Sequence, residues 1–69
     1  MTEQQITRLL ERAQEAVVMR DFDGATRLTL QAIVGISAEK DHFLAGQGHP
    51  TARQLADWFD QCSFVFNDV

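Results

Sequence analysis

The alternation of apolar and polar positions along the chain predicts helices rather than strands. Between about residues 3 and 20, apolar side chains recur at steps of three and four, which places them on one stripe of an amphipathic helix. They are Ile6, Leu9, Leu10, Ala13, Ala16 and Val17. Thr2 and Gln5 match the capping box that starts such a helix. One face of this first helix is therefore expected to be buried against the rest of the chain.

A second helix is expected to begin at about residue 22, because Asp21 and Asp23 are favourable N-cap residues. Its main apolar face consists of Ala25, Leu28, Ala32 and Ile36, with Thr29 and Ile33 beside it. Leu30 and Val34 point roughly the opposite way. A helix that is apolar on two sides is usually buried on two sides. One side can pack on the first helix, and the other requires a third helix or another chain.

The end of the second helix depends on Gly35. This residue can stop the helix at about 35, so that Ser37 caps a separate short helix through Leu44. Alternatively, Gly35 is tolerated at a cost of about 1 kcal/mol, and one helix continues to about residue 45. In either case the glycines and Pro50 predict a loop over residues 46–50.

A third helix is expected over about residues 51–65, because Thr51 and Gln54 form a second capping-box match. One face of this helix carries Leu55, Trp58, Phe59, Cys62 and Phe66, whereas Phe64 lies on the opposite side. The predicted fold is an all-α domain of three helices, an antiparallel hairpin plus a C-terminal helix. It has four helices if residues 37–45 form one of their own.

The length and charge of the chain restrict its partners. With 69 residues it forms one domain, and so small a domain is marginally stable unless something else supports it. Cys62 is the only cysteine, which excludes a disulfide within one chain and leaves oligomerisation or a partner as support. The net charge is −4 with no basic run, which disfavours binding to nucleic acid or to an anionic membrane. The polar N-terminus and the absence of a long apolar run favour a cytoplasmic protein that does not span a membrane.

Few residues are suited to catalysis or ligand binding. His42, Asp41 and Cys62 could be combined into a nucleophilic set, but Cys62 falls on the apolar face of its helix, where a thiol is inert. One cysteine and two histidines make a metal site improbable on composition. We therefore expect no enzymatic activity, no catalytic residues and no bound cofactor or metal.

The notable signal is an excess of apolar side chains over what one small core requires. Exposed aromatic groups beside other apolar groups are typical of protein–protein interfaces. The residues predicted to bind a partner are Leu30, Val34, Trp58, Phe64 and Phe66. An alternative is that Trp58, Phe59 and Phe66 simply fill the core. Phe64 is the hardest of these residues to bury within one chain.

One segment resembles a known family. The acidic–aromatic–acidic turn Asp21–Phe22–Asp23, followed by small residues at Ala25 and Ala32, is similar to the tetratricopeptide repeat, and the match covers about residues 5–37. The resemblance implies a helical hairpin that binds other proteins. Arg12 and Gly35 depart from the pattern, and residues 38–69 do not repeat it. The alternative is an ordinary three-helix bundle with a similar turn.

Together these features predict a non-enzymatic protein–protein interaction module. It would act as a homodimer, or as a small chaperone- or adaptor-like subunit that covers an apolar segment of a partner. The alternative is an acidic regulator of phage or plasmid type, which blocks a basic site on another protein. That function would use an acidic face made of Glu11, Glu15, Asp21 and Asp23. Salt distinguishes the two, because electrostatic capture weakens with ionic strength and apolar binding does not.

Overall fold

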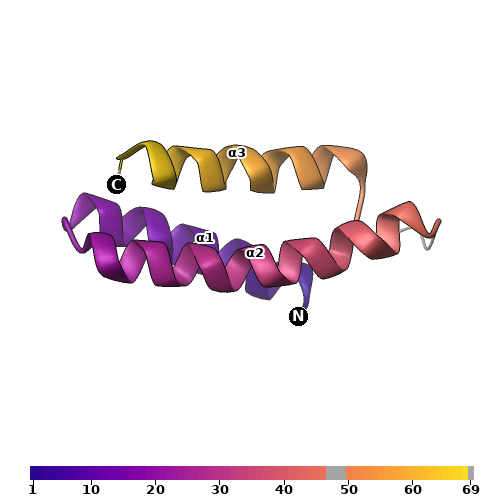
Figure 1. Ribbon diagram of the computed structural model, residues 1–69, viewed down its shortest axis with the longest axis horizontal. Helices are drawn as coiled ribbons and strands as arrows, with labels where there is room; N and C mark the ends of the chain where they lie inside the picture. The colour runs from indigo at the N-terminus through magenta and orange to yellow at the C-terminus, as the bar shows by residue number, and fades with distance from the viewer. Residues whose placement is uncertain (47–49, 69) are drawn as a thin grey trace.

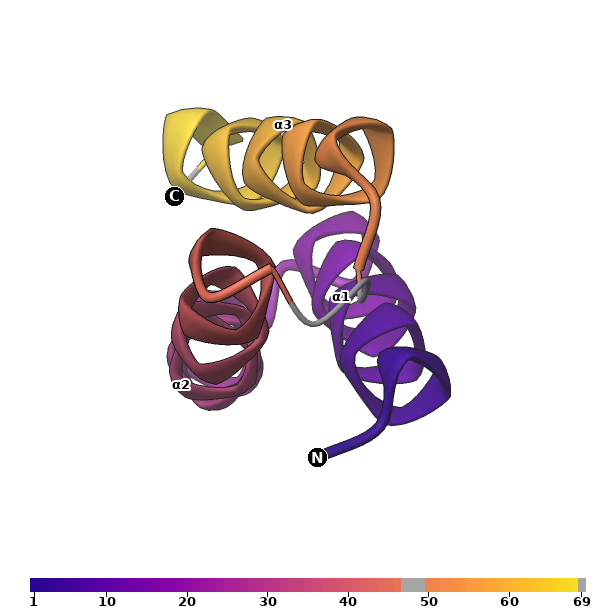
Figure 2. The ribbon, with the colours of Figure 1, turned by 90° about the vertical axis from the view of Figure 1, so that its right-hand side faces the viewer.

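The chain forms three α-helices in the computed structural model, which describes residues 1–46 and 50–68. They are α1 (Glu3–Val18), α2 (Phe22–Leu44) and α3 (Ala52–Asp68). Helices α1 and α2 form an antiparallel hairpin, and α3 lies obliquely across one face of it (Figures 1 and 2). The predicted fold class, an all-α domain built from a hairpin and a C-terminal helix, is confirmed.

The hairpin bend is tight because it combines a helix C-cap with the next helix N-cap. The backbone N–H of Asp21 donates to the Ala16 carbonyl at 2.8 Å, and that of Arg20 donates to the Val17 carbonyl at 3.0 Å. This pattern is a Schellman motif, and Arg20 adopts the left-handed conformation it requires, with φ of 62°. The Asp21 side chain then accepts from the Gly24 N–H and starts α2. Helix α1 therefore ends at Val18 rather than at residue 20.

Helix α2 continues through Gly35 without a break, which decides between the two predicted endings. Gly35 is buried where α2 meets the N-terminal part of the chain. A Cβ at this position would stand 2.7 Å from the Met1 sulfur and 3.0 Å from Cγ1 of Ile6. The glycine is therefore present because the two segments approach closely, and the helix accepts its lower propensity. The last turn of α2 projects beyond the other two helices (Figure 1).

All three helices contribute to the core. Its larger part is formed by Ile6, Leu10, Ala32, Ile36, Leu55, Trp58 and Cys62, and a smaller part by Ala13, Ala25 and Val65. Two polar groups inside it are satisfied: the Thr29 hydroxyl donates to the Ala25 carbonyl at 2.8 Å, and the indole N–H of Trp58 donates to the Thr7 hydroxyl at 3.3 Å. The second of these bonds connects α3 to α1.

The two capping boxes predicted from the sequence are seen to different extents. At the start of α1 both hydrogen bonds of the box are present, between Thr2 and Gln5. At the start of α3 the Thr51 hydroxyl accepts from the Gln54 N–H, which is one of the two bonds.

Candidate protein-interaction surfaces

Many large apolar side chains remain on the surface of this small domain. Those that are most exposed, at 70% or more, are Val18, Met19, Val34 and Leu44. Others are about half exposed: Met1, Leu30, Phe59, Phe64 and Phe66. Apolar surface that one chain leaves uncovered in this amount is typical of a site where another molecule packs. The helices group these residues into separate surfaces.

The first surface, which we call the α2–α3 edge, consists of Leu30, Val34, Phe59 and Phe66. The position of this surface on α3 follows from the hydrogen bonds of that helix. Trp58 bonds to Thr7 and Gln61 bonds to Gln14, so the flank of α3 that carries Gln61 faces α1. The opposite flank of α3 therefore faces α2. Phe59 and Phe66 lie on that flank, one position after Trp58 and one after Val65.

On α2, the edge begins next to Ile33. Gly35, on one flank of α2, stands against Met1 and Ile6, so that flank faces α1. Ile33 lies on the other flank and also packs against the core, so its side of α2 faces α3.

Leu30 lies one turn before Ile33 and neighbours it on the helix surface, and Val34 lies one turn after Leu30 and neighbours it in turn. Val34 is therefore the member of the edge farthest from α3, at 70% exposed. Leu30 is 52% exposed and Phe66 is 43% exposed. The α2–α3 edge thus joins apolar groups of two helices beside the core.

The second surface is an acidic hollow of about 460 Å³ on the other flank of α3, lined by Glu11, Gln14, Glu15, Val18, Met19 and Phe64. Phe64 therefore lies with the end of α1 and apart from Leu30 and Val34. The predicted binding residues do not form one site, because Phe64 and Phe66 lie on opposite flanks of α3. The sequence pattern also missed Val18 and Met19, although both fall outside the buried stripe of α1.

Trp58 is a correction to the predicted binding site. Its side chain is 0% exposed and packs among residues of all three helices. It is therefore part of the core and does not contribute to a surface in this conformation. The alternative prediction, that Phe59 and Phe66 fill the core together with Trp58, is wrong for these two residues, because they are 46% and 43% exposed. Val65 occupies the buried position instead, because α3 presents that side to the hairpin.

The predicted acidic face is divided between two places. Glu11 and Glu15 line the acidic hollow, whereas Asp21 and Asp23 lie at the hairpin bend. Asp21 is also engaged locally, because its carboxylate accepts the Gly24 N–H at 3.1 Å and caps α2. A capping carboxylate of this kind stabilises the helix N-terminus, so its presence has a structural reason independent of any partner.

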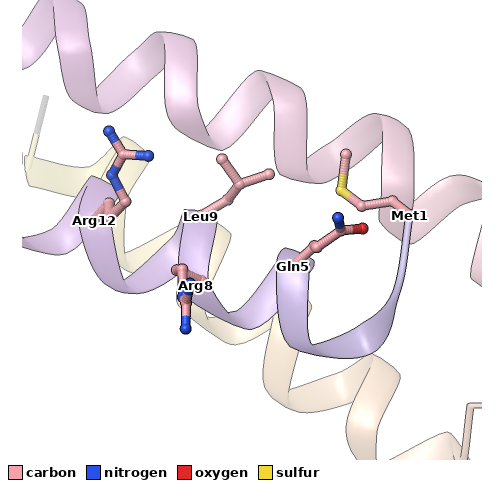
Figure 3. A pocket seen from close by; sticks show the side chains of 5 residues that line it. All are labelled: Met1, Gln5, Arg8, Leu9 and Arg12. Atoms are coloured by element: carbon pink, nitrogen blue, oxygen red, sulfur yellow. The ribbon is translucent and has the colours of Figure 1, made fainter.

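A third surface, the basic hollow, has a volume of about 470 Å³ and is lined by Met1, Gln5, Arg8, Leu9 and Arg12. Figure 3 shows that Leu9 and Arg12 point toward α2, that Arg8 points away from it, and that α3 lies behind the hairpin. The lining contains no carboxylate although the chain has a net charge of −4. The basic hollow is therefore a positively charged site on a negatively charged protein, with the apolar side chains of Met1 and Leu9 beside its two arginines.

The described residues offer little that suggests chemistry. Within residues 1–46 and 50–68, no group of three or more histidine, cysteine, aspartate or glutamate residues could hold a metal ion. Cys62 is buried, and that burial raises the pKa of its thiol, because the low-polarity surroundings disfavour the thiolate. Of the predicted loop over residues 46–50, residues 47–49 lie outside the described residues. No helix in the described part of the chain is long and apolar enough to cross a membrane.

The chain was also compared with known proteins. A scan of the chain against protein-family models, a search of curated proteins and a search of solved structures each find no match.

Proposed function

We propose that this protein is a non-enzymatic protein–protein interaction module that uses the α2–α3 edge to cover an apolar segment of another protein. The observation that supports it is the set Leu30, Val34, Phe59 and Phe66, each at least 43% exposed, on the flanks of α2 and α3 beside the buried core. Burial of apolar area contributes about 25 cal/mol per Å². Aromatic residues supply much of the energy in interfaces of this kind.

The geometry of the edge favours an amphipathic helix as the covered segment. Two neighbouring helices with apolar side chains along their junction can bind a third, amphipathic helix in the groove between them. The bound helix then makes its contacts through apolar residues spaced one turn apart. Leu30 and Val34 have this spacing on α2, and Phe59 and Phe66 are two turns apart on α3. The covered helix can belong to a partner, as in a chaperone- or adaptor-like subunit, or to a second copy in a homodimer.

The resemblance of residues 5–37 to a tetratricopeptide hairpin remains part of the proposal. Ala25 and Ala32 are both 0% exposed, as expected where small residues allow two helices to approach closely. Catalysis is not part of the proposal, because the thiol of Cys62 is buried and its raised pKa makes it a poor nucleophile. Localisation in the cytoplasm also stays a prediction.

The test compares variants of the edge with a matched control. Leu30→Ser and Phe66→Ser remove apolar groups from the edge, and Leu44→Ser makes the same type of change at the projecting end of α2, where Leu44 is 71% exposed. Binding of a hydrophobic dye and mass by light scattering over a dilution series are measured for each, with circular dichroism to confirm folding. The edge variants are expected to lower dye binding and association, and Leu44→Ser to lower them less.

Salt separates this function from the acidic regulator. Apolar binding at the α2–α3 edge is expected to persist in 1 M salt, where the Debye length falls to about 3 Å. Binding that disappears in salt, and that depends on Glu11 and Glu15 rather than on Leu30 and Phe66, would support the regulator instead. Equal dye binding and association in all variants would contradict a role for the edge.

A further inference from the structure

Helix α3 covers only one face of the α1–α2 hairpin, and we call the opposite face the open hairpin face. The basic hollow lies on this face, because α3 is behind the hairpin when the hollow is viewed from the front (Figure 3). In the same view Leu9 and Arg12 point from α1 toward α2. Another helix can therefore approach the hairpin from this side, as α3 does from the other.

Apolar and small side chains follow the junction of α1 and α2 on the open hairpin face. The flank of α1 that carries Leu9 and Arg12 continues one turn later with Ala16, and Leu9 and Ala16 are both half-buried. On α2 the facing flank carries Leu28 and Gly35, which lie two turns apart. Leu28 is half-buried, and Gly35 stands against the N-terminal part of the chain. This strip offers an apolar floor on which a third helix can pack closely.

Arginines flank the strip on both helices. Arg12 lies on α1 and is exposed. On α2, Arg27 lies two turns before Gly35, and each step of four residues places a position about 40° farther from the core, so Arg27 reaches the open side and is exposed. Arg8 lines the basic hollow beside Arg12. The residues on these two flanks include no carboxylate; they are Gln5, Leu9, Arg12, Ala16, Arg27, Leu28, Gln31, Gly35 and Ala38.

Carboxylates gather on a different side of the molecule. Glu11 and Glu15 line the acidic hollow next to α3. Asp57 lies one turn before Gln61, on the flank of α3 that faces α1. The chain has ten acidic and six basic residues, so a face with arginines and no carboxylate is a local site of positive potential. Such a site attracts anionic groups even though the whole protein is negatively charged.

We propose that the open hairpin face binds an acidic amphipathic helix of another protein. The apolar side chains of that helix pack on Leu9 and Leu28, and its carboxylates bond to Arg12 and Arg27, since guanidinium groups bind carboxylates through paired hydrogen bonds. This inference does not depend on the proposed function, because Leu30 and Phe66 lie along the junction of α2 with α3. The two surfaces can be occupied at the same time.

The apolar strip favours a protein helix over nucleic acid as the occupant. A phosphate backbone is bound through charge and leaves an apolar floor uncovered. The net charge of −4 also opposes the approach of a densely charged duplex. An amphipathic helix satisfies both features of the face, because it carries apolar and acidic side chains on adjoining sides.

A labelled peptide tests the proposal. The probe is a capped, fluorescein-labelled peptide with Leu at helical spacing and Glu at its other positions, and its affinity for the full chain is measured by fluorescence anisotropy in low salt. Arg12→Gln/Arg27→Gln is expected to weaken binding about tenfold, because two partly exposed charge pairs are lost. Arg53→Gln is the matched control, since Arg53 is exposed and belongs to α3; it should leave the affinity unchanged. A peptide with Ser in place of Leu should bind at least about tenfold more weakly.

The outcomes are distinct, with circular dichroism to show that each variant is folded. Binding that requires both the arginines and the Leu side chains supports the proposal. The proposal is overturned if the Leu–Glu peptide does not bind at millimolar protein, if Arg12→Gln/Arg27→Gln binds it as the unaltered protein does, or if the Ser peptide binds equally well. A labelled DNA duplex that binds more tightly than the peptide would also overturn it. Leu30→Ser and Phe66→Ser should leave peptide binding unchanged, so the two proposals fail separately; loss of peptide binding in these variants would assign the peptide to the α2–α3 edge instead.

Discussion

Replacement of Trp58 with alanine is expected to remove most of the stability of this protein. The indole side chain is 0% exposed and contacts core residues of all three helices. Truncation of a buried Phe or Trp to Ala costs about 3–5 kcal/mol, from lost transfer energy plus the cavity that remains. The change also leaves the Thr7 hydroxyl without the donor that bonds to it at 3.3 Å.

That cost is large compared with what a domain of this size has available. Native proteins are stable by roughly 0.05–0.15 kcal/mol per residue, so 69 residues correspond to about 3–10 kcal/mol. The Trp58→Ala variant should therefore be partly or wholly unfolded without denaturant. Urea titration followed by far-ultraviolet circular dichroism measures this directly, and it does not rely on fluorescence of the tryptophan that is removed.

Phe64→Ser is the matched control, because it removes an aromatic ring from the same helix at a position that is 54% exposed. It should lower the free energy of unfolding by less than about 1 kcal/mol, as is usual for surface changes. A Trp58→Ala variant with the same urea midpoint as the unaltered protein would refute the assignment of Trp58 to the core. Unfolding by Phe64→Ser instead would show that α3 is rotated relative to its position in this structure.

Other positions give further predictions. Gly35→Val should lower the thermal midpoint, because a Cβ would stand 3.0 Å from Cγ1 of the buried Ile6; a variant as stable as the parent would contradict that close approach. Arg20→Gly should stabilise the protein by up to about 1 kcal/mol in urea titration, because φ of 62° is strained for a residue with a side chain. Thr51→Ala should cost about 1 kcal/mol by the same assay, since its hydroxyl accepts the Gln54 N–H at the start of α3. Burial raises the pKa of the Cys62 thiol, so the folded protein should react with a thiol reagent far more slowly than the urea-unfolded chain. The stability linked to this thiol should be fully present below its unfolded pKa of about 8.5 and decline as the pH rises above it, a decline that Cys62→Ala should remove.

The sequence alone determined which stretches form helices and which side of α1 is buried. Ile6, Leu10 and Ala13 are all 0% exposed, as their spacing predicted. Periodicity carries this information because helix geometry is local: a residue's neighbours on the helix surface are three and four positions away in every context. The capping residues Thr2 and Asp21 are local signals of the same kind, and both cap the helices they were expected to cap.

The tertiary structure decided which flanks of α2 and α3 are covered. Phe59 and Phe66 lie close to the apolar stripe of α3, and only the oblique placement of that helix across the hairpin leaves them on an open edge while Val65 is buried. The continuation of α2 through Gly35 was equally undecided by propensity, because it depends on the close approach of Met1 and Ile6. The separation of Phe64 from Leu30 and Val34 has the same origin. A helical pattern states which residues share a face, but the neighbour that covers this face comes from elsewhere in the chain, and its angle is set by packing.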